Sequence, residues 1–524
     1  MRCEVSARDD TKYSEKAALR AKMDEKGEVH SPAATKTYGS DHAEIDPVKE
    51  RKLVRKLDFC IVPVVMLLYL LSFLDRVNIG NARLYGLEED LGINGNQFQT
   101  AVSLLFVTYI LSELPSNLIL KHYVRPSRWI SFITTAWGII ATLTGITQNY
   151  GGLIACRLLL GLVEGGLFPG CAIYLTFFYT KRELALRIGY LFVSAAIAGA
   201  FGGLLSYGIG FMDGVAGQRG WRWIVSINSI DEARSVLTSF TKMIIEGLPT
   251  FVLGIACWWI LADDADTAFY LNAEEKQLIL ARRAANPGQT ETFEWKDVRR
   301  GLRDWKIWAF CAAQFCMDTM LYGYSTFLPT IIKGIRPDAS AAIVQVLTIP
   351  CYAVGAICYM VAARFSDWRQ TRGPVIIAFG IFSVVGYALL ISDNGSQVHY
   401  AGCFLVALGL YVAVGIPLAW LPTNTPRYGK RTTATGLQLT IGNCSGIMAS
   451  FLYPTEEGPR FIRGHAVTMS LVAFGCVIYA LLYAYLKREI HKRDAGERDA
   501  AIEGLSDEEI NALGDDSPRF QLSA

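Results

Sequence analysis

The stretch RLLLGLVEGGLFPG, residues 157–170, places two opposite charges inside a segment that is otherwise apolar enough to cross a lipid bilayer. Arg157 and Glu164 are two helical turns apart, so both side chains and Gly161 lie on one face. An isolated ionised side chain in hydrocarbon costs at least roughly 2.5–3.5 kcal/mol, so such residues face a protein interior or a water-filled cavity. The pair therefore indicates a substrate or proton path, and Gly161 with Gly165 allows a neighbouring helix to approach closely.

Similar apolar blocks make up most of the chain. Its 524 residues are 52% hydrophobic and 19% charged, and blocks near the ~20 residues that span ~30 Å of hydrocarbon predict transmembrane helices. The predicted spans are 59–79, 98–120, 129–147, 152–178, 186–210, 244–261, 306–332, 341–363, 374–392, 400–421, 433–453 and 465–486. The predicted fold class is therefore an all-α polytopic membrane protein with twelve transmembrane helices in two six-helix bundles.

The domain organisation follows from the same blocks. The predicted parts are a disordered cytoplasmic tail at 1–56, an N-terminal bundle at 57–261, a central cytoplasmic loop at 262–305, a C-terminal bundle at 306–487 and a cytoplasmic tail at 488–524. The last part is charged, and we expect it to be solvated, with a short surface helix in its SDEEINAL piece as the alternative.

Lysine and arginine side chains cluster in the loops after the second, fourth, eighth and tenth predicted spans. By the positive-inside bias these loops and both termini are cytoplasmic. Asn394 begins an Asn-Gly-Ser sequon that this topology places outside the cell, where glycosylation is expected.

The twelve cysteines lie mostly in apolar spans and show no metal-ligand spacing, so no metal site and no disulfide framework are predicted. The net charge of +2 identifies no partner, and no nucleic-acid partner is expected.

Two six-span halves joined by a charged loop are typical of a major facilitator transporter, whose halves enclose a midplane site. Four motifs, in order along the chain, carry a closer resemblance. They are LSFLDRVNIGNARL at 71–84, RLLLGLVEGGLFPG at 157–170, GWRWI at 220–224 with IIEGLPTFVLG at 244–254, and TNTPRYGKRTTATGLQLTIGN at 423–443. Together they resemble the fungal anion:cation symporters of the allantoate permease family, over roughly residues 50–490.

Within that family the chain is most similar to the nicotinic acid permease branch. The stretches that carry this similarity are LYGLEEDLGI, YILSELPSNLIL, TAWGIIATLTG and DTMLYGYSTFLPTIIKG. The resemblance implies a proton-driven symporter of organic anions that needs no cofactor.

The resemblance also implies that an arginine of the first span holds the anion, here Arg76 with Asn78 and Gly80. A planar guanidinium gives a carboxylate two charge-assisted hydrogen bonds. The alternative is that Asp75 and Arg76 pair with each other or with loop charges at the membrane edge.

Glu164 resembles the acidic residue through which related symporters couple a proton, with Arg157 as its partner or as a second anion contact. Burial and a nearby arginine act in opposite directions on a carboxylate, which lets it bind and release a proton during a cycle. The alternative is a fixed Arg157–Glu164 ion pair that only braces the helix.

Span seven carries a polar stripe, because Gln314, Asp318 and Tyr322 recur at four-residue spacing on one face. We expect this stripe to form a second wall of the substrate site, although tyrosines are also ordinary core residues. Glu113, two residues before Pro115, either lines the cavity or stabilises a helix break.

Arg364, Asp367 and Arg372 follow span eight and resemble the superfamily's gating loop between helices. The equivalent loop of the first half, KHYVRPSRW, lacks the usual glycine and aspartate. A gating role is therefore predicted for the second-half loop.

The segment VSINSIDEARSVLTSFTK at 225–242 separates GWRWI from IIEGLPTF, which the family joins almost directly. One interpretation is an extracellular loop with a short surface helix. The other is a translated intron, since the codons for Val-Ser, Leu-Thr and the final lysine can contain the splice donor, branch-point and acceptor sequences.

The predicted function is proton-coupled import of a small organic anion, a nicotinate-like monocarboxylate first and an allantoate-like ureide second. The chain contains no nucleotide loop and no hydrolase or metalloprotease motif, so an enzyme is not expected. The alternatives are an exporter of an acidic secondary metabolite and a nutrient sensor that does not transport. We expect a monomer in the plasma membrane, with the anion, protons and the lipid bilayer as its partners.

Overall fold

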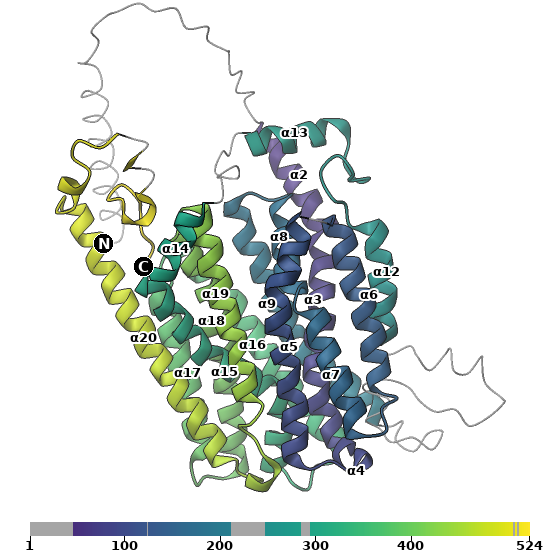
Figure 1. Cartoon of the computed structure of the whole chain (residues 1–524). Helices are drawn as coiled ribbons and strands as arrows, with labels where there is room; N and C mark the ends of the chain where they lie inside the picture. The colour runs from purple at the N-terminus through teal and green to yellow at the C-terminus, as the bar shows by residue number, and fades with distance from the viewer. Residues whose placement is uncertain (1–45, 123, 211–246, 285–293, 507–508, 511–512) are drawn as a thin grey trace, which may run out of the picture. The chain divides into compact units, whose positions relative to one another are not determined.

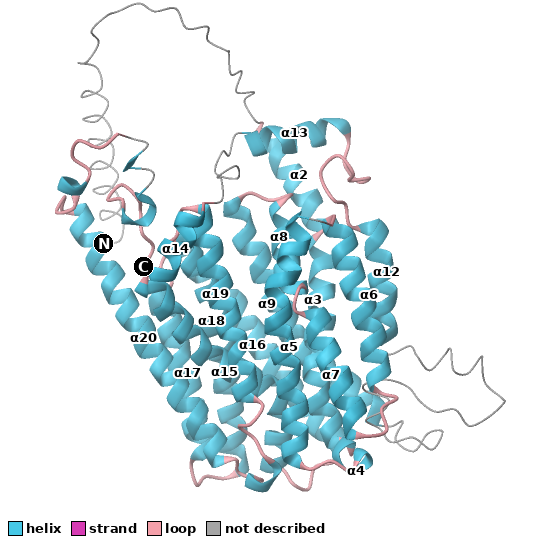
Figure 2. Cartoon of the chain, in the orientation of Figure 1, coloured by secondary structure: helices cyan, strands magenta, loops and turns pink. Residues whose placement is uncertain are grey.

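The computed structural model describes residues 46–122, 124–210, 247–284, 294–506, 509–510 and 513–524. These residues form helices joined by loops, and no strand is assigned among them (Figures 1 and 2). Seven of the described segments are each long and apolar enough to cross a membrane on length and composition alone. The predicted segment 225–242 lies outside the described residues.

The N-terminal half contains helices that coincide with the first six predicted spans. They are α3 (Val62–Leu84), α5 (Gly95–His122), α6 (Pro126–Thr144), α7 (Tyr150–Glu164) with α8 (Leu167–Thr176), α9 (Lys181–Gly210) and α12 (Gly247–Ile260). A short helix, α4 (Leu87–Leu91), follows α3. We call the end of the bundle that carries α4 the α4 end.

The C-terminal half contains the other six. They are α15 (Trp305–Ile335), α16 (Ala341–Arg369), α17 (Gly373–Ile391), α18 (Ser396–Thr423), α19 (Tyr428–Ala449) and α20 (Ile462–Asp494). The two halves meet where α3 packs on α15, α5 on α19, and α9 on α16. The predicted fold class of two six-helix bundles is confirmed.

The predicted span 152–178 is divided in the structure, because α7 ends at Glu164 and α8 begins at Leu167. Two glycines with low helix propensity separate the helices, and Pro169 lacks the N–H that would bond back to Gly165. The break places the Glu164 carboxylate at the very end of α7.

The glycine face of α7 allows the close approach of a neighbouring helix that the sequence predicts, and in the structure that helix is α5. A Cβ atom built on Gly161 would lie 2.2 Å from the backbone oxygen of Leu105, and one on Gly165 would lie 2.4 Å from that of Tyr109. No side chain larger than hydrogen fits at either position, so these glycines set the distance between the two helices.

The opposite end, which we call the α2 end, carries three helices outside the spans: α2 (Pro47–Cys60), α13 (Ala273–Ala284) and α14 (Trp295–Arg303) (Figure 1). Residues 47–56 are helical, so the prediction of a disordered tail over 1–56 is wrong for these residues. Asp46 caps α2 by accepting from the N–H of Val48, and Leu53 and Leu57 are buried.

Ion pairs hold α13 against the N-terminal half. Arg282 pairs with Glu50 at 2.9 Å and with Glu183 at 2.6 Å, and Lys56 pairs with Glu275 at 2.7 Å. Part of the predicted central loop therefore packs on α2 and α9.

The C-terminal segment, residues 513–524, packs against the rest of the protein, whereas the sequence predicts a solvated tail. The carboxylate of Asp515, only 2% exposed, lies 2.8 Å from the Nζ of Lys430 and 2.9 Å from that of Lys306. The backbone oxygen of Ser523 accepts hydrogen bonds from Trp420 and Asn424 at the end of α18. Charge pairing that composition does not reveal attaches this segment to the α2 end of the C-terminal half.

Candidate substrate and proton site

Arg76 and Glu164 form a buried ion pair between α3 and α7. The Nε and Nη2 atoms of Arg76 lie 2.9 and 2.8 Å from Oε1 of Glu164, and Ser72 donates its hydroxyl to the same oxygen. The Glu164 side chain is 1% exposed and that of Arg76 is 10% exposed. The two residues that sequence reasoning assigned to the anion and to the proton are therefore in direct contact.

Aromatic side chains contact Arg76 and its chain neighbour Asp75. The guanidinium of Arg76 lies 4.6 Å from the ring centroid of Tyr109, which gives it a cation–π contact. The indole N–H of Trp137 donates to the carboxylate of Asp75. Asp75 and Arg76 thus each have another partner, in contrast to the alternative in which they pair with each other.

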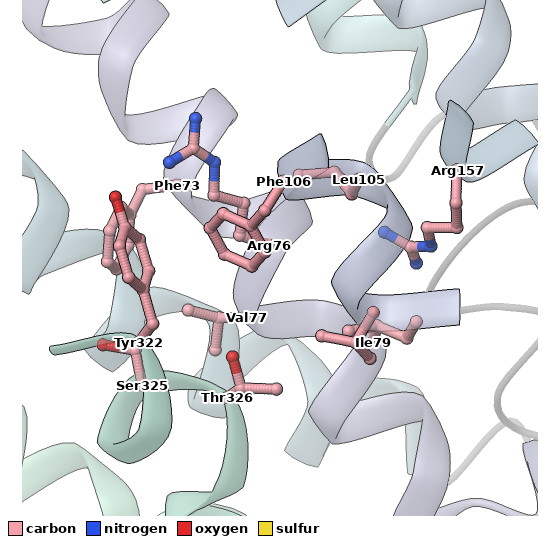
Figure 3. Close-up of a pocket in the computed structure, with 11 residues that line it drawn as sticks. Phe73, Arg76, Val77, Ile79, Leu105, Phe106, Arg157, Tyr322, Ser325 and Thr326 are labelled. Atoms are coloured by element: carbon pink, nitrogen blue, oxygen red, sulfur yellow. The ribbon is translucent and has the colours of Figure 1, made fainter. Parts of the chain in front are cut away.

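A small cavity adjoins Arg76 and is lined from both halves of the protein. Its lining residues are Phe73, Arg76, Val77, Ile79, Val102, Leu105, Phe106, Arg157, Tyr322, Ser325 and Thr326. In Figure 3, Arg76 and Arg157 lie on opposite sides of Leu105 and Phe106. Arg157 is 3% exposed, so its charge is held within the protein and not in lipid.

The cavity has a volume of about 20 Å³, which is room for one or two water molecules. An aromatic carboxylate is larger than this space. Substrate enters only if the helices around the cavity move apart.

The polar stripe of α15 divides into two groups. Gln314 and Asp318 are buried together, with Gln314 Nε2 donating to Asp318 Oδ1 at 2.8 Å, and neither lines the cavity. Gln438 and Tyr479 both donate to Oε1 of Gln314. Tyr322 does line the cavity, with its ring centroid 4.7 Å from that of Phe106.

A hydrogen-bonded chain joins the halves beside the cavity. The hydroxyl of Tyr322 donates to Asn443 Oδ1 at 2.6 Å, and Asn443 Nδ2 donates to Glu113 Oε2 at 3.4 Å. Glu113 lies on α5 and Asn443 on α19, so the Glu113 carboxylate contacts the other half and not a helix break at Pro115.

Asn78, predicted as a substrate contact, is buried and turned toward α9. Its Oδ1 accepts from Asn81 Nδ2 at 2.9 Å and lies 3.4 Å from a Cβ built on Gly202. It is not among the residues that line the cavity.

Arg83, whose role is not predicted from the sequence, joins the halves at the α4 end. Its guanidinium pairs with Glu88 at 3.0 Å, donates to the backbone oxygen of Tyr453 and to the hydroxyl of Thr455, and is 8% exposed. A basic residue near the end of a span usually extends to the membrane surface, so only the nearby Glu88 could have signalled a buried role.

The helices α3 and α15 also approach each other closely near the α4 end. A Cβ atom built on Gly80 would lie 1.9 Å from the backbone oxygen of Thr326. Together with the Arg83 contacts, this approach closes the cavity from the α4 end.

Of the three predicted gating residues, Arg364 and Asp367 lie in the last two turns of α16, and Arg372 is the N-cap of α17. Arg372 donates to the backbone oxygen of Ala419 and, at 3.2 Å, to the hydroxyl of Thr423, so it joins α17 to α18. Arg364 and Asp367 are exposed. Asn394 is exposed in the loop before α18, at the α4 end, and donates to Ser392.

Comparisons with known proteins agree with this architecture. The family model described as the Major Facilitator Superfamily matches residues 65–450. An uncharacterised transporter of Schizosaccharomyces pombe is 38% identical over 491 residues, covering 93% of this chain and 94% of that protein. The high-affinity nicotinic acid transporter of Saccharomyces cerevisiae is 31% identical over 448 residues, covering 85% of this chain and 80% of that protein.

A solved structure has the same fold. It is a bacterial homologue of the human lysosomal transporter Spinster in an inward-facing, unoccupied conformation, with a TM-score of 0.58 and 14% identity over 81% of this chain and 96% of that one. Because the family model covers residues 65–450, which include those that enclose the cavity, and the two fungal relatives cover 93% and 85% of the chain, the chain belongs to the Major Facilitator Superfamily and is a multi-pass membrane transporter, not an enzyme.

Proposed function

We propose that this chain is a proton-coupled symporter that imports a small organic anion, with nicotinate or a similar monocarboxylate as its first substrate class. The observation that carries the proposal is the contact between Arg76 and Glu164 beside a cavity lined from both halves. The name of the yeast relative, a nicotinic acid transporter, supports the substrate class.

The ion pair supplies a coupling mechanism through competition. The Glu164 carboxylate and a substrate carboxylate both need the guanidinium of Arg76, whose planar fork serves one carboxylate well. A proton on Glu164 removes its charge and frees Arg76 for the anion. Loss of that proton restores the ion pair and displaces the anion, so that proton and substrate bind together and leave together.

The remaining cavity residues suit a flat anion. Phe73, Phe106 and Tyr322 offer aromatic surface, and Arg157 provides a second cation on the same cavity. In a widened cavity a ring would pack among these aromatic side chains while its carboxylate contacts Arg76.

Transport would proceed by alternating access, in which the halves rock about the cavity. Opening the α4 end requires that Arg83 leaves Tyr453 and Thr455 and that Gly80 moves away from Thr326. We assign the basic α2 end to the cytoplasm, which places import in the direction from the α4 end to the α2 end. We further propose a monomer in the plasma membrane that uses the proton gradient and no cofactor.

Uptake of radiolabelled substrates tests this function in cells that lack endogenous carriers. We expect nicotinate uptake to rise as the external pH is lowered from 7.5 to 5.5. Uptake of a panel of ring carboxylates and of allantoate then ranks the substrate classes. Loss of preloaded substrate with no uptake at either pH would contradict import and favour an exporter.

The Glu164→Gln variant tests the coupling separately. Glutamine cannot carry the proton and does not hold Arg76 with a charge, so we expect exchange of labelled for unlabelled substrate to continue while acid-driven accumulation is lost. If Glu164→Gln still accumulated substrate with the wild-type pH dependence, Glu164 would not be the coupling residue.

A further inference from the structure

The outward face of α14 combines exposed apolar side chains, one of them a tryptophan, with exposed basic ones. Trp295 is 78% exposed and Leu302 is 45% exposed, and both lie on the same face as Arg299 because these positions recur at four and three residues. Lys296 and Arg303, also exposed, flank this face.

The opposite face of α14 is fixed to the C-terminal half. Asp297 is 1% exposed and accepts from Arg427 Nε at 2.7 Å. Gly301 lies against Thr433, 3.4 Å from its Cγ2 atom when a Cβ is built on the glycine. The helix therefore cannot rotate to bury Trp295 without breaking these contacts. Its exposed face stays turned away from the C-terminal half.

The exposed apolar surface continues from α14 onto the first turn of α15. Trp305 is 54% exposed and Trp308 is 46% exposed. The indole N–H of Trp308 donates to the backbone oxygen of Leu302 at 2.8 Å, which ties the two helices together. The Trp305 ring lies 5.0 Å from that of Tyr485 on α20.

This position coincides with a membrane interface. At 1.5 Å per residue the 31 residues of α15 extend over roughly 46 Å, longer than the ~30 Å hydrocarbon core. We expect the first turn, which carries Trp305 and Trp308, to be the part that lies at headgroup depth. Tryptophan concentrates at that depth. Lysine and arginine there meet the negative surface that acidic lipids give to the cytoplasmic leaflet.

We propose that the outward face of α14, with Trp305 and Trp308, is a binding surface for the headgroups of acidic phospholipids. Lys296, Arg299 and Arg303 contact the phosphate and carboxylate groups, and Trp295 and Leu302 insert between the headgroups. Such binding holds the start of α15 at a fixed depth in the membrane. The surface lies at the α2 end of the C-terminal half and does not depend on the proposed transport reaction.

Direct lipid binding by the purified full-length protein tests this surface. The probes are fluorescent phosphatidylserine and fluorescent phosphatidylcholine with the same acyl chains, titrated in neutral mixed micelles and followed by anisotropy. Removing the three charges in K296Q/R299Q/R303Q should weaken phosphatidylserine binding by about tenfold or more, and phosphatidylcholine binding should not change. Raising the salt concentration should weaken phosphatidylserine binding to the wild type.

The matched control K296R/R299K/R303K keeps the charges and should bind phosphatidylserine as the wild type does. Size-exclusion chromatography of both variants shows whether each protein is folded. If the glutamine variant binds phosphatidylserine as tightly as the wild type, or if the charge-preserving variant loses binding to the same extent, the proposal is overturned.

Discussion

Arg76 has one guanidinium, which in the proposed cycle serves Glu164 and the substrate in turn. Arg76→Lys keeps the charge but replaces a planar fork by a single ammonium group. A lost charge-assisted hydrogen bond costs about 1.5–3 kcal/mol, so we expect the KM for nicotinate to rise roughly tenfold to a hundredfold. Initial uptake rates over a range of nicotinate concentrations measure the change.

The control for this prediction is the amount of protein at the cell surface. A surface level like that of the wild type separates lost binding from lost folding. Arg76→Gln removes the charge completely and should abolish uptake at the same surface level. Unchanged uptake by Arg76→Gln would contradict the role of this residue.

The spacing of charges along α7 predicted that Arg157 and Glu164 belong to the candidate site, but not which residues they pair with. Arg157 and Glu164 do share a face of α7. The partner that the structure gives Glu164 is Arg76, which lies 88 positions away on α3. Helical periodicity contains no information on which neighbouring helix faces a residue, so Arg76, Glu113 and Asn443 could be named as polar residues but not connected.

Among the helices, α5 and α7 depend on a backbone approach that tolerates no side chain. Gly161→Ala would place a Cβ 2.2 Å from the backbone oxygen of Leu105, so the helices must separate. Overpacking of this kind costs about 1–3 kcal/mol, and we expect a lower thermal unfolding midpoint of the purified protein.

Gly436→Ala is the matched control, because Gly436 lies within α19 and a Cβ there meets nothing within 4 Å. Alanine is the better helix former by about 1 kcal/mol, so this variant should be as stable as the wild type or more stable. Equal midpoints for Gly161→Ala and the wild type would show that α7 does not need its glycine face.

The docked C-terminal segment should respond to pH through Asp515. Burial alone would raise the pKa of this carboxyl, but the ammonium groups of Lys306 and Lys430 hold it below its ordinary value. A lowered pKa in the docked state means that the stabilisation is present at neutral pH and is lost as the pH falls through that lowered value. We expect Asp515→Asn to release the segment at pH 7, since removing one partner of a buried ion pair costs on the order of 3 kcal/mol.

Limited proteolysis of the purified protein measures this release. Asp515→Asn should be cleaved faster than the wild type within 495–513, and the difference should disappear in strong acid with an acid-active protease. Asp516→Asn is the matched control, because Asp516 is the exposed neighbour. Equal cleavage of Asp515→Asn and Asp516→Asn at pH 7 would contradict the role of the buried ion pairs.

Apolar length located the spans, because each needs about 20 apolar residues regardless of its neighbours, but it did not show that 152–178 is divided into α7 and α8. Sequence composition was not sufficient where tertiary contacts decide whether a polar segment folds. The helix at 47–56 forms because Leu53 and Leu57 find a core, and the segment at 513–524 packs because Asp515 meets two lysines. Polar composition alone predicts a solvated tail in both places.

At the scale of the whole molecule, alternating access requires that the closed α4 end can open. Gly80 permits the closed arrangement, since any Cβ there would lie 1.9 Å from the backbone oxygen of Thr326. Gly80→Ala should therefore favour conformations in which α3 and α15 are separated at this end. Because a transporter must visit both states, we expect uptake to fall even though Arg76 and Glu164 are intact.

Labelling from outside the cell distinguishes this shift from misfolding. Thr326 is 6% exposed in the wild type, so a membrane-impermeant maleimide should react slowly with the thiol of Thr326→Cys. Labelling of the parent protein is subtracted to remove the contribution of the native cysteines. Adding Gly80→Ala should raise the rate severalfold because the α4 end then spends more time open. Gly208→Ala in α9, where a Cβ meets nothing within 4 Å, is the matched control and should leave the rate unchanged. A slow rate in the Gly80→Ala background, with uptake intact, would mean that the approach of Gly80 to Thr326 does not limit opening at this end.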